Sequence, residues 1–186
     1  MALADDRYPL PDFVQWSGFP FEGDLHVRSL RPFRDHDRPR QGEPGGPPCT
    51  PCGRADDTYI WADDNWRVSL MTSGLPIQLM LESRRHLDLD GLDEDLAADY
   101  GRMTVRLTKA MHAVGGIGRV HFSRWGDGAE HFHVWFYGRP LGASQMLGFC
   151  LPMWAMIVPP ITDEVARANA LIVATELAKT SGQVML

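Results

Sequence analysis

The sequence predicts an α+β fold, in which an antiparallel sheet packs against one long helix and a C-terminal helix. Two sets of short runs, rich in β-branched and aromatic residues and bounded by turn residues, indicate strands. A helical repeat of apolar residues lies between the two sets, and a second helical pattern follows the last strand. The chain has 186 residues, 44% of them hydrophobic, which is enough for one domain with a sizeable core.

The first quarter of the chain differs from the rest in composition. Residues 1–48 are rich in proline and glycine and show neither a helical nor a strand period. We therefore expect an extended arm over 1–48 that packs on the core, and a domain over 49–186. Four aromatic residues of the arm favour packing over full disorder, because they would find apolar surface to cover: Phe13, Trp16, Phe19 and Phe21.

Neither a signal peptide nor a membrane span is expected. The N-terminal sequence MALADDRYPLPDF lacks a basic region followed by an apolar one. No window approaches the ~18 uninterrupted apolar residues that a membrane-spanning helix needs. The sequence therefore predicts a cytoplasmic protein.

Five runs predict strands. TYIWADDNWRVSLM, residues 58–71, predicts a hairpin of two strands, and LPIQLMLES, residues 75–83, predicts a third. GRVHFSR, residues 118–124, and EHFHVWFYG, residues 130–138, predict two more that are joined by a short turn over 125–128.

Two segments predict helices. The first is amphipathic, because apolar residues recur every three or four positions: Leu92, Leu96, Tyr100, Met103, Leu107 and Met111. Gly115 and Gly116 are expected to end it. The second follows Thr162, the predicted N-cap, has two acidic residues in its first turn, and ends before Gly182.

Charge and cysteine content narrow the possible functions. The net charge of −6 argues against a broad nucleic-acid surface, although a small phosphate ligand held by a few groups is compatible with it. Two of the three cysteines form the motif Cys49-Thr-Pro-Cys52. In a cytosolic chain this spacing indicates metal binding or redox chemistry before a structural disulfide. Cys150, in LGFCLPMW, is expected to be a small buried hydrophobic residue.

The run 130–138 places two histidines one residue apart. Side chains alternate along a strand, so one face would carry His131, His133, Trp135 and Tyr137. The other would carry the core residues Phe132, Val134 and Phe136. We expect the histidine face to line a wetter surface or a pocket. A half-exposed polar face without a ligand is the simpler interpretation of the two histidines.

The two cysteines give the histidines a second interpretation. A spacer of two residues in a proline- and glycine-rich loop lets both sulfurs turn toward one ion. Zinc then needs two further ligands, and neutral imidazoles are the usual ones. Seven histidines are available in the sequence. The alternative is a reduced pair of cysteines without a metal.

Three segments together resemble the histidine triad (HIT) superfamily, including its galactose-1-phosphate uridylyltransferase-like branch. They are PCTPCGRADDTYIWADDNWRVSLM, LMLESRRHLDLDGLDED and GDGAEHFHVWFYGRP, which occur in the superfamily's order over residues 49–140. Some members of the superfamily bind zinc through two cysteines and two histidines. The resemblance implies that the corresponding ligands in this chain are Cys49, Cys52, His86 and His131. Four protein ligands leave no open coordination position, so this zinc would be structural. The resemblance also implies a homodimer.

The resemblance further implies that His133 is a nucleophile. The enzyme would then be a nucleotidyl hydrolase or transferase that acts on a phosphate-linked nucleotide through a covalent intermediate. A neutral imidazole suits this role, because the ordinary pKa of histidine is near 6.5. The alternative is a binding protein that keeps the fold and the metal and holds a nucleotide or another phosphorylated or planar ligand.

Several positions depart from the pattern of the superfamily. Trp135 stands where triad enzymes have histidine and uridylyltransferases have glutamine, and Met71 stands where many members have a ribose-binding aspartate. Asp127 and Gly128 replace the glutamine and serine of the phosphate loop. The predicted substrate-binding residues are therefore Trp135, Tyr137, Arg139, Asp127 and Gly128. Four arginines are candidates for a phosphate clamp: Arg84, Arg85, Arg124 and Arg139.

Overall fold

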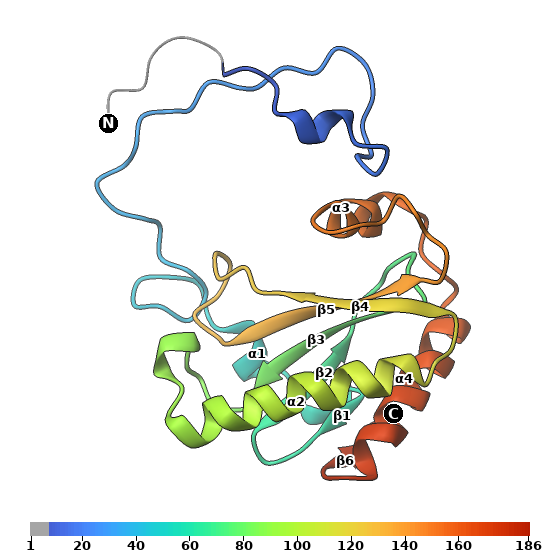
Figure 1. The fold of residues 1–186 in the computed structure, drawn as a ribbon. Helices are drawn as coiled ribbons and strands as arrows, with labels where there is room; N and C mark the ends of the chain where they lie inside the picture. The colour runs from blue at the N-terminus through green and yellow to red at the C-terminus, as the bar shows by residue number, and fades with distance from the viewer. Residues whose placement is uncertain (1–7) are drawn as a thin grey trace.

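The computed structural model describes residues 8–186 and contains one six-stranded sheet in the order β4-β5-β3-β2-β1-β6 (Figure 1). The strands are β1 (Trp61–Ala62), β2 (Trp66–Leu70), β3 (Ile77–Ser83), β4 (Ile117–Ser123), β5 (His133–Pro140) and β6 (Gln183–Val184). All neighbouring strands pair antiparallel. The helices are α1 (Thr50–Gly53), α2 (Glu94–His112), α3 (Cys150–Ile157) and α4 (Asp163–Ala178), with short 3-10 turns at Asp12–Gln15, Asp56–Thr58 and Leu89–Gly91. The predicted α+β class is confirmed.

Helices α2 and α4 cover one face of the sheet and form the main core with it (Figure 1). The alternation of residues 132–136, at and just before the start of β5, puts Phe132, Val134 and Phe136 on this face, as the sequence predicts, and all three are buried. Both helices begin at side chains that accept a backbone hydrogen: Asp93 accepts from Leu96, and the predicted cap Thr162 accepts from Val165. Within residues 8–186, no helix combines the length and apolar character that crossing a membrane requires.

Helix α3 lies on the opposite face of the sheet, the face of His133 (Figure 1). Leu151 and Ala155 of α3 pack with Leu75 and with Tyr137 of β5 in a second apolar cluster. From the sequence, a wetter surface or a pocket is expected on this face, and neither of the two predicted helices covers 150–157. That expectation was wrong for Tyr137, which is 4% exposed, because the uncharged segment after β5 folds back over the strand.

The N-terminal arm contacts the rest of the chain near its two ends. At one end Phe13 meets Phe149 edge to face at 5.2 Å between ring centroids, and Trp154 donates to the carbonyl of Gly18 at 2.7 Å. At the other end Gln41 pairs with Ala129. Residues 28–39 between these contacts are exposed. Residues 1–7 of the predicted arm lie outside the described residues, and the domain boundary at 48 and 49 stays a prediction.

Candidate functional site

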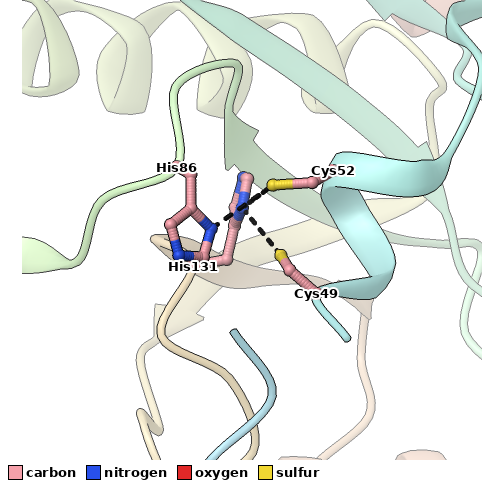
Figure 2. Close-up of side chains that lie close together, drawn as sticks. All are labelled: Cys49, Cys52, His86 and His131. Carbon is pink, nitrogen blue, oxygen red and sulfur yellow. Dashed lines mark hydrogen bonds between the residues drawn. The ribbon is translucent and has the colours of Figure 1, made fainter. Parts of the chain in front are cut away.

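The four predicted metal ligands lie together where α1, the loop after β3 and the start of β5 meet (Figure 2). Sγ of Cys49 is 3.3 Å from Nδ1 of His131, and Sγ of Cys52 is 3.5 Å from the same nitrogen. Sγ of Cys52 is also 3.3 Å from Nδ1 of His86. One donor atom from each residue lies within 4.8 Å of all the others. The fold therefore brings together residues that are far apart in sequence: Cys52 and His86 are 34 positions apart, and Cys49 and His131 are 82 positions apart.

His131 is held in the tautomer that a metal ligand needs. Its Nε2 lies 2.8 Å from the carbonyl oxygen of Ser83, which can only accept, so Nε2 carries the hydrogen and Nδ1 keeps its lone pair toward the sulfurs. Burial lowers the pKa of His131, and the opposing effect of the Ser83 hydrogen bond does not cancel this shift. The neutral ring is the form that binds a metal.

His86 and Cys52 are the two exposed ligands, and a carboxylate lies near the imidazole of His86. Oε2 of Glu130 lies 3.7 Å from its Nε2, while its Nδ1 faces Cys52. At this distance Glu130 is a charged neighbour of the ring and not its hydrogen-bond partner, although carboxylates near the second nitrogen of metal-binding histidines are common. Gly42 closes the site from the arm: it has a φ of 92°, and a Cβ there would lie 2.5 Å from Cε1 of His86. Only glycine fits this position without a shift of the histidine.

The donor set fits zinc. A tetrahedral ion with bonds of roughly 2.0–2.3 Å separates its donor atoms by about 3.3–3.8 Å, close to the sulfur–nitrogen distances of 3.3–3.5 Å seen between the cysteines and His131. Without a cation, burial and the neighbouring Cys49 raise the pKa of Cys52 to about 11. A metal ion would reverse this effect, because a coordinating thiol loses its proton. Thiolate and imidazole together are the donors of closed zinc sites.

His133, the predicted nucleophile, lies next to this cluster on β5 and is half-buried. Its Nδ1 is 2.7 Å from the carbonyl oxygen of His131, and this carbonyl can only accept a hydrogen bond. Nδ1 therefore carries the hydrogen, and Nε2 has a free lone pair. Among residues 8–186, Nε2 of His133 makes no hydrogen bond.

The register of the sheet sets what surrounds His133. Glu82 of β3 is its direct partner, and Arg67 of β2 is the partner of Glu82, so the three side chains form a row on one face. Glu82 is 1% exposed and Arg67 is 6% exposed. Neither Glu82 nor Arg67 is among the site residues predicted from the sequence. Alternation along 75–83 places Glu82 and Leu81 on different faces of the strand. Only the pairing of β3 with β5 shows that Glu82 lies beside His133.

Two predicted substrate residues follow His133 along the strand. Trp135 is half-buried, and its ring is stacked on that of Tyr137 with centroids 6.4 Å apart and planes 18° apart. Tyr137 lies under α3, and burial raises its pKa to about 12. A ligand on this face could therefore contact Trp135, whereas α3 separates Tyr137 from solvent.

The other predicted substrate residues lie elsewhere. Arg139 is six residues beyond His133, about 20 Å along a strand, and donates to the carbonyl of Ala143 at 2.8 Å. Asp127 and Gly128 are exposed in the loop before β5, where the carbonyl of Gly128 accepts from Gln41. The structure therefore brings the loop and Trp135 near the start of β5 and places Arg139 at its other end.

The remaining candidate clamp arginines are engaged in ion pairs. Arg84 pairs with Asp56 at 2.6 Å, and Arg85 pairs with Asp93 at 2.9 Å. Arg124 pairs with Asp88, which also binds Arg40 of the arm. None of these three arginines presents a free guanidinium to His133.

Comparison with protein-family models finds no match, and comparison with curated protein sequences finds none either. Among solved structures, a histidine triad protein from Sinorhizobium meliloti aligns with a TM-score of 0.53 and 18% identity, over 63% of this chain and 87% of that chain. A histidine triad protein from Bradyrhizobium japonicum aligns with a TM-score of 0.50 and 18% identity, over 65% of this chain and 87% of that chain. The predicted histidine triad fold is confirmed, and the assignment to a zinc-containing or uridylyltransferase-like branch stays a prediction.

Proposed function

We propose that this protein with the histidine triad fold is a nucleotidyl hydrolase or transferase that acts on a phosphate-linked nucleotide through a covalent intermediate on His133. One observation carries this proposal: the hydrogen bond at 2.7 Å from Nδ1 of His133 to the carbonyl oxygen of His131. It fixes the neutral tautomer and leaves the Nε2 lone pair free for attack. The fold supports the same class of reaction by analogy.

The reaction would take two steps. Nε2 of His133 attacks the α-phosphorus, a P–N bond forms, and the bond to the leaving group breaks. The leaving group departs with that electron pair and takes a proton from solvent. The modified ring is a cation, and the His131 carbonyl stabilises it by accepting the Nδ1 hydrogen. Water or an acceptor phosphate then attacks phosphorus, breaks the P–N bond and restores the neutral imidazole, and a proton from attacking water goes to solvent.

The metal that we propose is a structural zinc ion, held by Cys49, Cys52, His86 and His131. Bound zinc would supply rigidity, since four protein ligands leave no open coordination position. His131 connects this rigidity to the reaction, because its ring belongs to the cluster and its carbonyl orients His133. Small errors in the position of a nucleophile are costly.

The experiment that tests the proposal is turnover of nucleoside phosphoramidates, dinucleoside polyphosphates and nucleotide sugars by zinc-loaded protein. We expect the wild type to turn over at least one class and His133→Ala to lose that turnover. His121→Ala is the matched control, because His121 lies on the same face but two rows away, opposite Tyr137. A folded, zinc-loaded wild type that is inactive on the whole panel would refute the enzymatic proposal for these substrates.

A second candidate function is a binding protein that holds a nucleotide or another phosphorylated or planar ligand. Trp135 favours it, because an indole offers one donor and an apolar face where the resemblance implies histidine or glutamine. Helix α3 also packs over the neighbouring Tyr137. Binding of a nucleotide by both wild type and His133→Ala, without turnover by either, would support this candidate.

The proposed assembly is a homodimer in a reducing compartment. β4 is an edge strand of the sheet, and its Phe122 is 52% exposed, which supports an edge-to-edge partner. The two ligand cysteines are unpaired, and thiols of this kind persist in the cytoplasm. We therefore propose a cytoplasmic location, a small phosphorylated substrate, and no nucleic-acid partner.

A further inference from the structure

Polar side chains with no part in the metal cluster gather beside His133 on the outer face of β2 and β3. Glu82 lies between His133 and Arg67 in one cross-strand row, and Ser69 lies in the next row. Arg54, the residue that ends α1, reaches over these strands from the metal-binding segment. Arg54 is absent from the arginines that the sequence analysis selected.

The guanidinium of Arg54 contacts both neutral and charged side chains. It donates to Oγ of Ser69 at 3.1 Å and to Oε2 of Glu82 at 3.4 Å, and its guanidinium lies 4.6 Å from the centre of the Tyr59 ring. Ser69 itself donates to the same Glu82 oxygen at 2.7 Å. Because Cys49 is the N-cap of α1 and Cys52 lies within this short helix, the metal cluster also fixes the backbone at Arg54, the residue that follows it. The guanidinium is thus pre-positioned on the His133 face.

Two guanidiniums share this cluster with two carboxylates, because Arg67 also lies 3.8 Å from Oδ1 of the half-exposed Asp56. A second guanidinium, that of Arg67, lies 4.6 Å from the same Tyr59 ring, while Glu82 is the one carboxylate in contact with Arg54 among the described residues. Arg67 donates to the carbonyls of Pro51 and Ser83 and not to Glu82. Two atoms of this cluster, Nε of Arg67 and the hydroxyl of Tyr59, are among the six buried side-chain polar atoms that have no partner within residues 8–186. Buried polar atoms without a partner are rare in native structures, and a bound ligand or water molecule usually supplies the missing hydrogen bond.

Part of the Arg54 guanidinium stays available after it has paired with Glu82. Its side chain is 32% exposed, against 1% for Glu82, and its Nε makes no hydrogen bond among the described residues. A guanidinium has five N–H donors in a fixed plane and binds phosphoryl oxygens in pairs. Trp135 offers a single N–H donor at its position, so a phosphate beside His133 needs further donors from another element.

We propose that Arg54 binds the phosphoryl oxygens of a substrate that His133 attacks, while Glu82 and Ser69 hold its guanidinium in place. This inference rests on the proposed function, since it names the phosphate-binding group of that site. The ligand class is a phosphate mono- or diester with at least one free anionic oxygen. Arg54 is then a substrate-binding residue, and Glu82 is a positioning residue.

The test is calorimetric titration of zinc-loaded protein with AMP, UMP and inorganic pyrophosphate. We expect the wild type to bind at least one of these probes and Arg54→Gln to weaken that binding about tenfold to a hundredfold, the usual effect of losing a charged hydrogen-bond donor. Arg167→Gln is the matched control, because Arg167 is exposed on α4. It removes the same charge and should leave binding unchanged.

A double variant separates binding from charge compensation. Arg54→Gln leaves Glu82 buried without its cation, whereas Arg54→Gln with Glu82→Gln leaves a neutral pair that should fold with zinc as the wild type does. If Arg54 binds phosphate, the double variant stays as weak as Arg54→Gln. Recovery of wild-type binding by the double variant would overturn the inference, as would a wild type that binds none of the probes.

The outcomes also distinguish this inference from the proposed reaction. Binding that depends on Arg54 in a protein without turnover would support the inference and count against the enzyme. Turnover that depends on His133 but is the same in Arg54→Gln, with unchanged binding, would support the enzyme and overturn the inference.

Discussion

The indole nitrogen of Trp66 donates to Oδ2 of Asp99 at 2.8 Å, and this bond joins β2 to α2. Trp66 is fully buried in the main core. Asp99 also accepts from the side chains of Asn65 and Arg102. Burial of Asp99 disfavours its charge, but the three donors outweigh burial and lower its pKa.

Removal of this carboxylate should therefore destabilise the protein in a pH-dependent way. Asp99→Ala leaves the Trp66 donor buried without a partner, and we expect a loss of about 1–3 kcal/mol at pH 7 in urea unfolding. Because the folded-state pKa is lowered, the stabilisation is present above the unfolded pKa of about 3.9 and is lost as pH falls through the lower folded value. The difference between wild type and variant should shrink below about pH 4. The exposed Asp95→Ala is the control, and a pH-independent difference would contradict this account.

Metal analysis should find about one zinc ion per chain. Cys52→Ser and His86→Ala remove donors of the cluster and should each lower the zinc content and the midpoint of thermal unfolding. Cys150→Ala is the control, because Cys150 is buried at the first position of α3, outside the metal cluster, and its loss should leave the metal bound. A protein that folds with the same stability in strong chelator would exclude a structural metal.

Arg40 should control the order of the loop before β5. Its guanidinium donates to Asp88 at 2.7 Å and to the carbonyl of Gly126 at 2.7 Å, and the next residue, Gln41, exchanges backbone hydrogen bonds with the loop. Arg40→Ala should speed hydrogen exchange at the amides of Gln41 and Glu130. Arg38→Ala, two residues earlier on the exposed part of the arm, should leave both amides unchanged. Equal exchange in the two variants would show that Arg40 does not hold the loop.

The packing of α3 on the sheet depends on Leu151. This side chain is fully buried against Leu75 and Tyr137, so Leu151→Ala should cost about 2–4 kcal/mol in unfolding free energy. It should also expose Tyr137 and lower its pKa from about 12 toward the ordinary value near 10, as read from its ultraviolet titration. Met156→Ala, at an 81% exposed position of the same helix, should change neither quantity. An unchanged Tyr137 titration in Leu151→Ala would mean that α3 does not shield it.

Light scattering should give the mass of a dimer, with β4 at the interface. Phe122→Lys places a charge on the exposed side of this edge strand and should shift the protein toward the monomer. Leu171→Lys is the control, because Leu171 is similarly exposed on α4, away from this edge. A wild-type monomer, or equal dissociation by both variants, would remove β4 from the proposed interface.

Most of the regular elements were predictable because their residues repeat with a local period. The strands over 58–83 and 118–138 and the helix after Asp93 all occur where alternation or helical spacing predicts them. Helix α3 was not predictable in this way. Its sequence CLPMWAMI is apolar on every side and contains Pro152, so it has no period, and its contacts with Tyr137 come from the tertiary fold.

The same distinction applies to the candidate site. The cysteine spacing and the His131–His133 alternation are local, and the four ligands indeed meet in space. Glu82 and Arg54 could not be found from the sequence, because their place beside His133 depends on which strands pair and on where α1 lies. β6 was missed for a similar reason, since two residues pair with β1 only after α4 has returned the chain to the sheet.

The alternation of β5 also constrains how this chain can change over evolution. His131 and His133 lie on one face of the sheet, and the buried residues Phe132 and Val134 lie on the other. Insertion or deletion of a single residue between the histidines would send His133 into the core and a phenylalanine or valine to the site. This strand can therefore vary only by substitution, whereas the loop over 124–130 can gain or lose residues. Homologous sequences should show length changes in the loop and none between the two histidines.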